Sequence, residues 1–360
     1  MTAGPIIRVE ASDFAGAFDL VEKAIDRRSI IPAAACIRLR AGDDHRIEYF
    51  GTSAAGTIAT RTPMKILQEG DFDVCVPAEK LAPLVGKASG AIKLSITPNG
   101  RLLVESARSR AQLPMLPGAT MPQPQSPGEA LAEFDTPGLG ELIESVAFIA
   151  DDKDIRDFCQ GVWIESDGEG IHVVATNVLM MATNQIAIKA PEFGFMLMEK
   201  SAALLTGFNP ERIVVMQDGI IAVRGESTLQ AKKALMKYPA WRRIPPDLKN
   251  SITFPLAQLR DAISVHRFYD SRIGAVRFFN DGDGYQIEIK DGEHDVDFEL
   301  EGVEESGDVK FEYAFKGEQL AKMLARITGD KVTLFWDPAR PVGFLMQEGS
   351  WRGIVSRINL

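Results

Sequence analysis

The feature that most constrains the fold of this 360-residue chain is an internal period of about 60 residues. Six segments place apolar residues at positions i, i+3, i+4 and i+7, the spacing of an amphipathic helix. These segments begin near residues 13, 77, 137, 198, 255 and 316, so the successive intervals are 64, 60, 61, 57 and 61 residues. Such a regular period predicts a chain built from six similar units.

Strand-like runs fill the space between the predicted helices. Apolar runs such as 92–96, 212–216 and 331–335 are typical of strands, and pairs such as Asn99-Gly100 mark hairpin turns. Antiparallel hairpins with helices on one face predict an α+β architecture. A single unit of this size is marginally stable alone, so we expect the units to fuse in pairs.

Two proline-rich stretches, 114–127 and 239–250, fall after the second and the fourth unit. Proline-rich segments are typical linkers. They predict three domains of two units each, at residues 1–126, 127–249 and 250–360. The alternative is that regular spacing arises by chance in an α+β protein, but chance does not explain why the breaks follow alternate units.

Composition excludes several classes of protein. The chain is 45% hydrophobic and 25% charged, as globular proteins are, and it has no run of about 18 apolar residues that would span a membrane. Lys+Arg 40 against Asp+Glu 50 gives a net charge of −10, which argues against a protein that coats nucleic acid.

The three cysteines are widely scattered, so we expect buried thiols in a reducing cytoplasm. The four histidines are equally scattered, so we expect no metal site and no cofactor.

The sequence offers little for catalysis. Asp151, Asp152 and Asp154 could ligate Mg²⁺ as in a nuclease. Carboxylates in a row on a loop are usually solvated, however, and no nucleotide-binding, zinc-protease or hydrolase motif occurs. We therefore expect no catalytic residue.

Several segments, in order and at matching spacing, carry a family resemblance. They include RRSIIPAA (27–34), SARSRAQLPMLP (106–117), DDKDIRDFCQGV (151–162), VVATN (173–177) and YPAWRRIPP (238–246). Together they resemble the bacterial DNA polymerase III beta subunit, the replication sliding clamp. The most specific match is YPAWRRIPP, which resembles FPDYRRVIP in that family. The chain is identified as a divergent member.

The resemblance implies a DNA clamp fold of three similar domains, with two chains closing into a ring around duplex DNA. A clamp does no chemistry; it tethers a polymerase, and processivity follows from effective concentration. The implied partners are double-stranded DNA, the DNA polymerase III alpha subunit, the clamp loader, other proteins with a clamp-binding motif and a second copy of the chain. A ring can be acidic outside and basic inside, so the net charge is compatible with threading on DNA. The alternative is a clamp-fold interaction protein that no longer encircles DNA.

The resemblance also implies which basic residues face the DNA. On the predicted helices and loops these are Lys23, Arg27, Arg28, Lys80, Lys153, Arg156 and Lys200. Arg28 and Lys153 lie where the family's DNA-touching loops lie. The alternative for each of them is an ordinary solvated helix face.

In this family the subunit junction joins the first domain of one chain to the third domain of the other. The resemblance places Arg108 and Arg110 on its basic side, Phe268 at its apolar contact, and Asp295, Asp297 and Glu299 on its acidic side. The family's aromatic residue after the arginine pair is Ala111 in this chain. The alternative for the acidic stretch is a plain charged edge strand.

Clamp partners insert a short hydrophobic peptide between the second and third domains. By position, the implied pocket residues are Cys159, Thr176, Val178, Leu179, Met180, Met181, Pro239, Trp241, Arg243, Ile244, Pro341, Ile354 and Ser356. The family's Gly-His-Arg is replaced here by Val178-Leu179-Met180, which exchanges a polar rim for apolar, adaptable side chains. We expect an altered peptide preference. The alternative is that residues 178–181 form a buried strand without a pocket.

Overall fold

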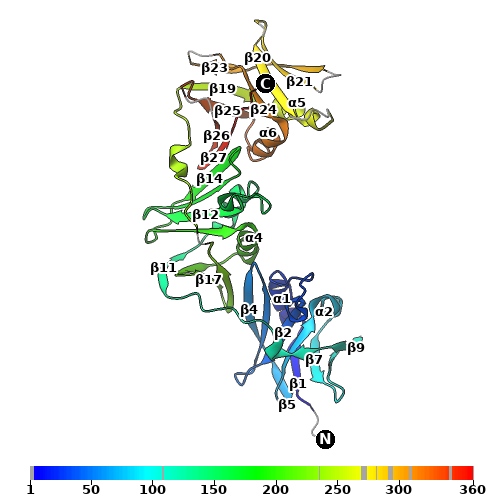
Figure 1. The fold of residues 1–360 in the computed structure, drawn as a ribbon. Helices are drawn as coiled ribbons and strands as arrows, with labels where there is room; N and C mark the ends of the chain where they lie inside the picture. The colour runs from blue at the N-terminus through cyan, green and yellow to red at the C-terminus, as the bar shows by residue number, and fades with distance from the viewer. Residues whose placement is uncertain are drawn as a thin grey trace. The chain divides into compact units, whose positions relative to one another are not determined.

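A computed structural model describes residues 4–107, 109–234, 236–268, 274–280, 282–290, 295–307, 310–339 and 343–359. Two predicted site residues, Arg108 and Pro341, lie outside the described residues, as does the side chain of Asp295. The chain forms two compact units (Figure 1): Met1–Gly140 with Lys200–Ala234, and Glu141–Glu199 with Leu235–Leu360.

The described part of the chain contains six α-helices, which begin within two residues of the six predicted starts. Their bounds are α1 (Ala11–Glu22), α2 (Ala78–Val85), α3 (Leu139–Ala147), α4 (Glu199–Phe208), α5 (Leu256–Ser264) and α6 (Gly317–Leu324). Short 3-10 helices are η1 (Pro32–Ala35), η2 (Gly118–Thr120), η3 (Asp157–Cys159), η4 (Trp241–Arg243) and η5 (Val265–Phe268). Among the described residues, no helix has the length and apolar character needed to cross a membrane.

The first unit contains two antiparallel sheets. The five-stranded sheet has the order β5 (Lys65–Gln68), β1 (Ile6–Glu10), β7 (Ala91–Ile96), β8 (Arg101–Ser106), β9 (Ser109–Pro114). The nine-stranded sheet has the order β10 (Leu116–Pro117), β6 (Asp73–Pro77), β2 (Cys36–Ala41), β3 (Arg46–Ser53), β4 (Gly56–Pro63), β18 (Ser227–Lys232), β17 (Gly219–Arg224), β16 (Arg212–Met216), β11 (Ala130–Asp135).

The amphipathic stripe of α1 explains how that helix packs on the first unit. Phe14, Phe18 and Val21 are buried against β3 and β4, and the Phe14 ring meets Tyr49 edge-on at 5.1 Å. Gly51 on β3 permits this approach, because a Cβ there would lie 2.8 Å from a methyl of Val21. Burying each large apolar side chain contributes roughly 1.5–3 kcal/mol. The apolar residues that recur at helical spacing in this segment therefore form the buried face of α1.

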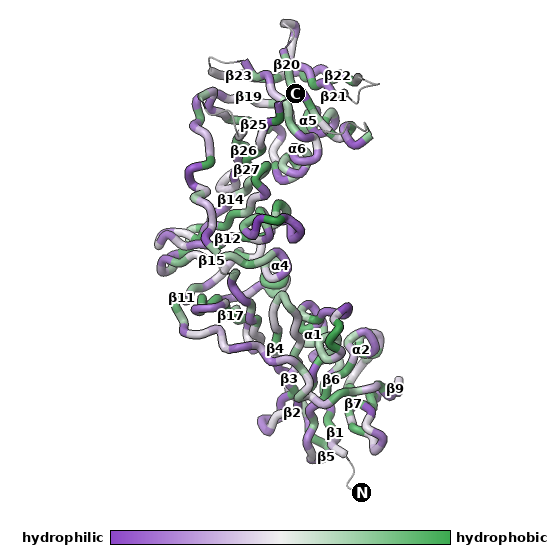
Figure 2. Tube along the Cα trace, in the orientation of Figure 1, coloured by the Kyte–Doolittle hydropathy of each residue, from purple (hydrophilic) through white to green (hydrophobic). Residues whose placement is uncertain are grey.

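The second unit also contains two antiparallel sheets. The nine-stranded sheet has the order β15 (Phe193–Met198), β12 (Gly161–Ser166), β13 (Ile171–Thr176), β14 (Met180–Ile186), β27 (Trp351–Val355), β26 (Phe344–Glu348), β25 (Lys331–Trp336), β19 (Asn250–Pro255), β23 (Glu304–Ser306). The four-stranded sheet has the order β22 (Asp295–Leu300), β21 (Tyr285–Lys290), β20 (Ala275–Asn280), β24 (Tyr313–Lys316). Figure 2 shows hydrophobic residues along β26 and β27, whose side chains are mostly buried.

Two strand pairings join segments that the sequence assigns to different domains. β18 pairs with β4, with Leu229 opposite Ile58, and β14 pairs with β27, with Met181 opposite Ile354. Each pairing makes one continuous sheet, so the predicted middle domain, 127–249, is shared between the two compact units. The α+β class and the clamp architecture are confirmed, while the boundaries at 126 and 249 stay predictions.

Candidate functional site

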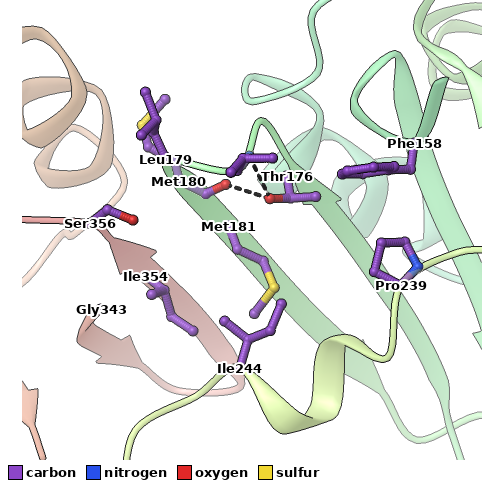
Figure 3. A pocket seen from close by; sticks show the side chains of 11 residues that line it. Phe158, Thr176, Leu179, Met180, Met181, Pro239, Ile244, Gly343, Ile354 and Ser356 are labelled. Atoms are coloured by element: carbon purple, nitrogen blue, oxygen red, sulfur yellow. Dashed lines mark hydrogen bonds between the residues drawn. The ribbon is translucent and has the colours of Figure 1, made fainter. Parts of the chain in front are cut away.

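An apolar pocket of about 300 Å³ opens in the second unit, where β14 meets β27. Its lining residues come from η3, β13, β14 and the turn between these two strands, the residue before β26, the end of β27 and the segment around η4. They are Phe158, Thr176, Val178, Leu179, Met180, Met181, Pro239, Ile244, Gly343, Ile354 and Ser356. Figure 3 shows Ile244 and Met181 pointing toward the same space from opposite walls.

The pocket has a buried floor and an exposed apolar rim. Met180, Met181 and Ile354 are at most 4% exposed, whereas Val178, Leu179 and Ile244 are 50%, 39% and 40% exposed. No lining residue is charged. An apolar hollow with an apolar rim binds apolar side chains of a ligand and disfavours charged ones, because burying an unpaired charge is costly.

A tight turn between β13 and β14 shapes the rim. The Thr176 hydroxyl donates to the carbonyl of Met180 at 2.8 Å and accepts from the N–H of Val178 at 3.0 Å. The Asn177 side chain accepts from the N–H of Met180 at 2.8 Å. Two residues of the lining carry a hydroxyl group, Thr176 and Ser356. The Thr176 hydroxyl is already bonded within the turn, which leaves that of Ser356 to bond a ligand.

Nine of the predicted pocket residues line this hollow, and three do not. Cys159 is fully buried, and its neighbour Phe158, which the sequence analysis missed, lines the pocket in its place. Trp241 packs against His172, with 6.1 Å between ring centroids, and Arg243 is likewise absent from the lining. Gly343, also missed, lies close to β27: a Cβ there would be 2.8 Å from Ile354.

A basic groove of about 710 Å³ lies in the first unit, beside the end of α1 and the start of α4. Three predicted DNA-facing residues, Lys23, Arg28 and Lys200, line it together with Asp26. Lys23 donates from Nζ to the carbonyl of Gly207 at 2.7 Å, which holds its side chain across the groove. The structure thus brings together three cations that lie up to 177 residues apart, from position 23 to position 200.

The other four predicted DNA-facing residues lie elsewhere and are exposed. Arg27 pairs with Glu22, and Lys80 on α2 pairs with Glu79 at 3.1 Å. Lys153 and Arg156 lie in the loop after α3. Arg156 binds Asp154 with two hydrogen bonds, at 2.8 and 2.6 Å, which lower the pKa of that carboxyl to about 2.

Of the predicted junction residues whose side chains the structure describes, three lie on edge strands and Phe268 lies at the end of η5. Arg110 is on β9, an edge of the five-stranded sheet, and pairs with Glu105 at 3.4 Å. Asp297 and Glu299 are exposed on β22, an edge of the four-stranded sheet. Phe268, at the end of η5, is 78% exposed. Edge strands leave backbone groups available for pairing with another chain.

The three cysteines are free and buried, and burial raises the pKa of the Cys36 thiol to about 11. Within the described residues, no group of three or more His, Cys, Asp or Glu side chains is arranged to hold a metal ion.

Comparison with known proteins shows what this fold is related to. No protein-family model matches the chain. The chain is 28% identical over 200 residues to the beta sliding clamp of Caulobacter vibrioides, a match that spans 52% of this chain and only about half (51%) of that protein. It is 23% identical over 348 residues to the beta sliding clamp of Pseudomonas putida, covering 92% of this chain and 93% of that one. The crystal structure of the DNA polymerase III subunit beta from Pseudomonas aeruginosa matches with a TM-score of 0.89 at 20% identity, over 99% of this chain and 100% of the other. The chain is a divergent relative of the bacterial beta sliding clamps.

Val178, on the pocket rim, adopts a strained backbone conformation. Val178, which the family resemblance aligns with a glycine, has a φ of +74°, in the left-handed region that β-branched residues rarely adopt. The hydrogen bonds of Thr176 and Asn177 hold the turn in this conformation. The pocket therefore keeps an exposed valine on its rim despite strain of about 1–3 kcal/mol.

Val178→Gly should raise the stability of the protein. Glycine adopts a φ of +74° without strain, and the gain exceeds the extra backbone entropy that glycine loses on folding, so the net effect is about 1 kcal/mol. Urea denaturation measures the change. Val223→Gly on β17, in an ordinary strand, is the control and should destabilise by a similar amount. A Val178→Gly protein that is less stable than wild type would show that the turn is unstrained.

Proposed function

We propose that this chain is a DNA polymerase processivity factor, a ring-shaped sliding clamp that encircles duplex DNA and tethers the replicative polymerase. The observation that carries the proposal is the sliding-clamp fold, which extends along the whole chain. A clamp works by topology, so it needs no catalytic residue, and we assign none. It requires instead a way to close a ring, a surface that tolerates DNA and a site for partners.

For ring closure, we propose a homodimer in which the edge strands β9 and β22 of different copies pair. Arg108 and Arg110 would meet Asp295, Asp297 and Glu299, and Phe268 would be covered at the same junction. The exposure of Phe268 and the unpaired outer side of each edge strand support this arrangement. Opposite charges on facing strands favour pairing between copies and disfavour pairing of like edges.

For DNA, we propose that Lys23, Arg28 and Lys200 face the duplex through the basic groove, with Lys153 in the second unit. Arg27, Lys80 and Arg156 add charge but already have carboxylate partners. Few and partly neutralised cations suit a ring that slides, because each strong phosphate contact adds to the barrier for movement.

For partners, we propose that the pocket takes a short apolar segment of the DNA polymerase III alpha subunit, of the clamp loader and of other clamp-binding proteins. The exposed Val178 and Leu179 on the rim, with Met180 buried beside them, support a preference that differs from that of clamps with Gly-His-Arg. Such a rim favours ligands whose flanking residues are also apolar.

Retention on circular DNA tests the function. The protein should sediment as a dimer, at twice 39.4 kDa. After loading onto a nicked plasmid with a bacterial clamp loader and ATP, it should stay bound roughly tenfold longer than on the same plasmid cut once, because only a cut lets a ring slide off. Gel filtration of labelled protein with the DNA measures this. Equal release from both forms would favour the alternative, an interaction protein with the clamp fold that no longer encircles DNA.

A further inference from the structure

One wall of the apolar pocket is a short segment with little backbone support. Residues 238–244 contribute Pro239 and Ile244 to the lining. Three backbone hydrogen bonds within the segment are local, donated by Trp241, Arg243 and Ile244 to carbonyls two or three residues earlier. Local bonds shape the turn but do not fix where the turn lies. The position of this wall therefore depends on side chains.

Arg242 attaches this segment to the β12–β13 hairpin by ion pairs, in addition to the hydrogen bond from the Tyr238 hydroxyl to the carbonyl of Val174 at 3.5 Å. Its guanidinium makes an ion pair with Glu165 at the end of β12 and a second with Asp167, at 3.4 Å, in the β12–β13 turn. The Glu165 carboxylate also accepts from the Trp163 indole N–H at 2.6 Å. The Asp167 carboxylate is hydrogen-bonded to His172 Nε2 at 2.7 Å and accepts from the backbone N–H of Gly170 at 3.0 Å. Contacts within the hairpin thus hold both carboxylates in place independently of Arg242.

Aromatic rings align the same segment. The Tyr238 ring stacks on Trp163, with centroids 5.1 Å apart and planes 14° apart, and Tyr238 is 8% exposed. The Arg242 guanidinium lies 4.5 Å from the centroid of the Trp241 ring, which in turn packs on His172. These contacts place Arg242 between a ring on its own segment and two carboxylates on the hairpin.

We propose that Arg242 is a positioning residue for the pocket: it anchors the wall of residues 238–244 to the β12–β13 hairpin and so fixes Pro239 and Ile244 for ligand binding. This proposal rests on the proposed function of the pocket. Arg242 itself does not line the hollow. Its effect on ligand affinity is indirect, because a wall that moves must be reordered when the ligand binds.

Two measurements separate this role from general stability. Peptide affinity is measured by fluorescence polarisation with a labelled, uncharged pentapeptide ending in leucine and phenylalanine, because a hollow of about 300 Å³ accepts two such side chains. Hydrogen–deuterium exchange of residues 236–249 measures how firmly the wall is held, with or without peptide. Arg242→Ala should weaken peptide binding about three- to tenfold and raise exchange in this segment. Arg242→Lys should retain part of the peptide affinity and part of the protection from exchange.

A matched control is available in the first unit. Arg212 makes an ion pair with Glu133 at 2.7 Å and is 48% exposed at its side chain, against 49% for Arg242. Arg212→Ala removes a surface arginine of similar exposure together with one ion pair, and it should leave peptide affinity unchanged. Glu165→Gln keeps an acceptor for Trp163 but loses the charge, so it tests the same attachment from the hairpin side. If Arg242→Ala fails to fold, Glu165→Gln replaces it and should show the same two effects.

The outcomes distinguish the two proposals. Unchanged exchange and unchanged affinity in Arg242→Ala or Glu165→Gln would overturn the positioning role. Raised exchange in the variants, with no peptide binding by the wild type, would overturn the proposed function of the pocket while retaining Arg242 as the anchor of this segment. An equal loss of affinity in Arg212→Ala would show that the effect comes from surface charge in general and would overturn the proposal.

Discussion

Ile244→Asp should weaken peptide binding roughly 100-fold while leaving the protein folded. Ile244 lines the apolar pocket and is 40% exposed, so aspartate at this position is hydrated in the free protein. A bound peptide would bury that carboxylate among methionine and isoleucine side chains, with no charged residue in the lining to pair with it. A penalty of about 3 kcal/mol corresponds to a loss of affinity of roughly 100-fold.

Leu248→Asp is the matched control for this change. Leu248 lies four residues further along the same segment and is 57% exposed, but it does not line the pocket. Both variants add one negative charge to the same region, so a difference between them isolates the pocket. Fluorescence polarisation should show a large loss for Ile244→Asp and an affinity within about twofold of wild type for Leu248→Asp. Equal losses would place the peptide outside the hollow.

Phe311→Ala should cause the largest loss of stability of the substitutions considered. Phe311 is fully buried at the centre of an aromatic cluster in the second unit. Its ring centroid lies 5.1 to 6.2 Å from those of Phe254, Phe278, Tyr313, Phe315, Trp336 and Phe344. Because six rings surround the site, the cavity left by truncation cannot collapse without moving several strands. We expect the free energy of unfolding to fall by about 3–5 kcal/mol.

The control for this substitution is Phe279→Ala on β20. Phe279 is half-buried beside Arg277 and lies outside the cluster, so its truncation should cost about 1 kcal/mol. Urea denaturation followed by tryptophan fluorescence reports on the second unit, since Trp336 is part of the cluster. Similar losses for the two variants would mean that the cluster relaxes around the cavity.

The sequence predicted the helices accurately because each buries one continuous face. The stripe Phe14, Phe18 and Val21 is such a face, and the position of α1 follows from it within two residues. The pocket residues were predicted by resemblance, and the structure gathers nine of them around one hollow. The residues Lys23, Arg28 and Lys200 were predicted by resemblance to face DNA, and the structure places all three around one groove.

The errors within the site come from local geometry that a position-by-position match does not contain. Cys159 was predicted to line the pocket, but at the end of η3 it points into the core, and Phe158 faces the hollow. A shift of one residue exchanges an inward for an outward side chain. Trp241 was predicted to line the pocket because its segment does, yet its ring is held against His172 and the Arg242 guanidinium.

The sequence by itself determined the repeating architecture, because the spacing of apolar residues decides which face of each helix is buried. The same spacing recurs in every unit of about 60 residues. Only the tertiary structure decided how the strands are joined and what the pocket is. Strand pairing between β14 and β27 brings Met181 opposite Ile354, 173 positions apart in the sequence, from 181 to 354. The wall at residues 238–244 is set by ion pairs and ring contacts to a hairpin about 75 residues earlier, as between Arg242 and Asp167. Interactions between residues so distant in sequence leave no periodic signal, so they become visible only when the chain is folded.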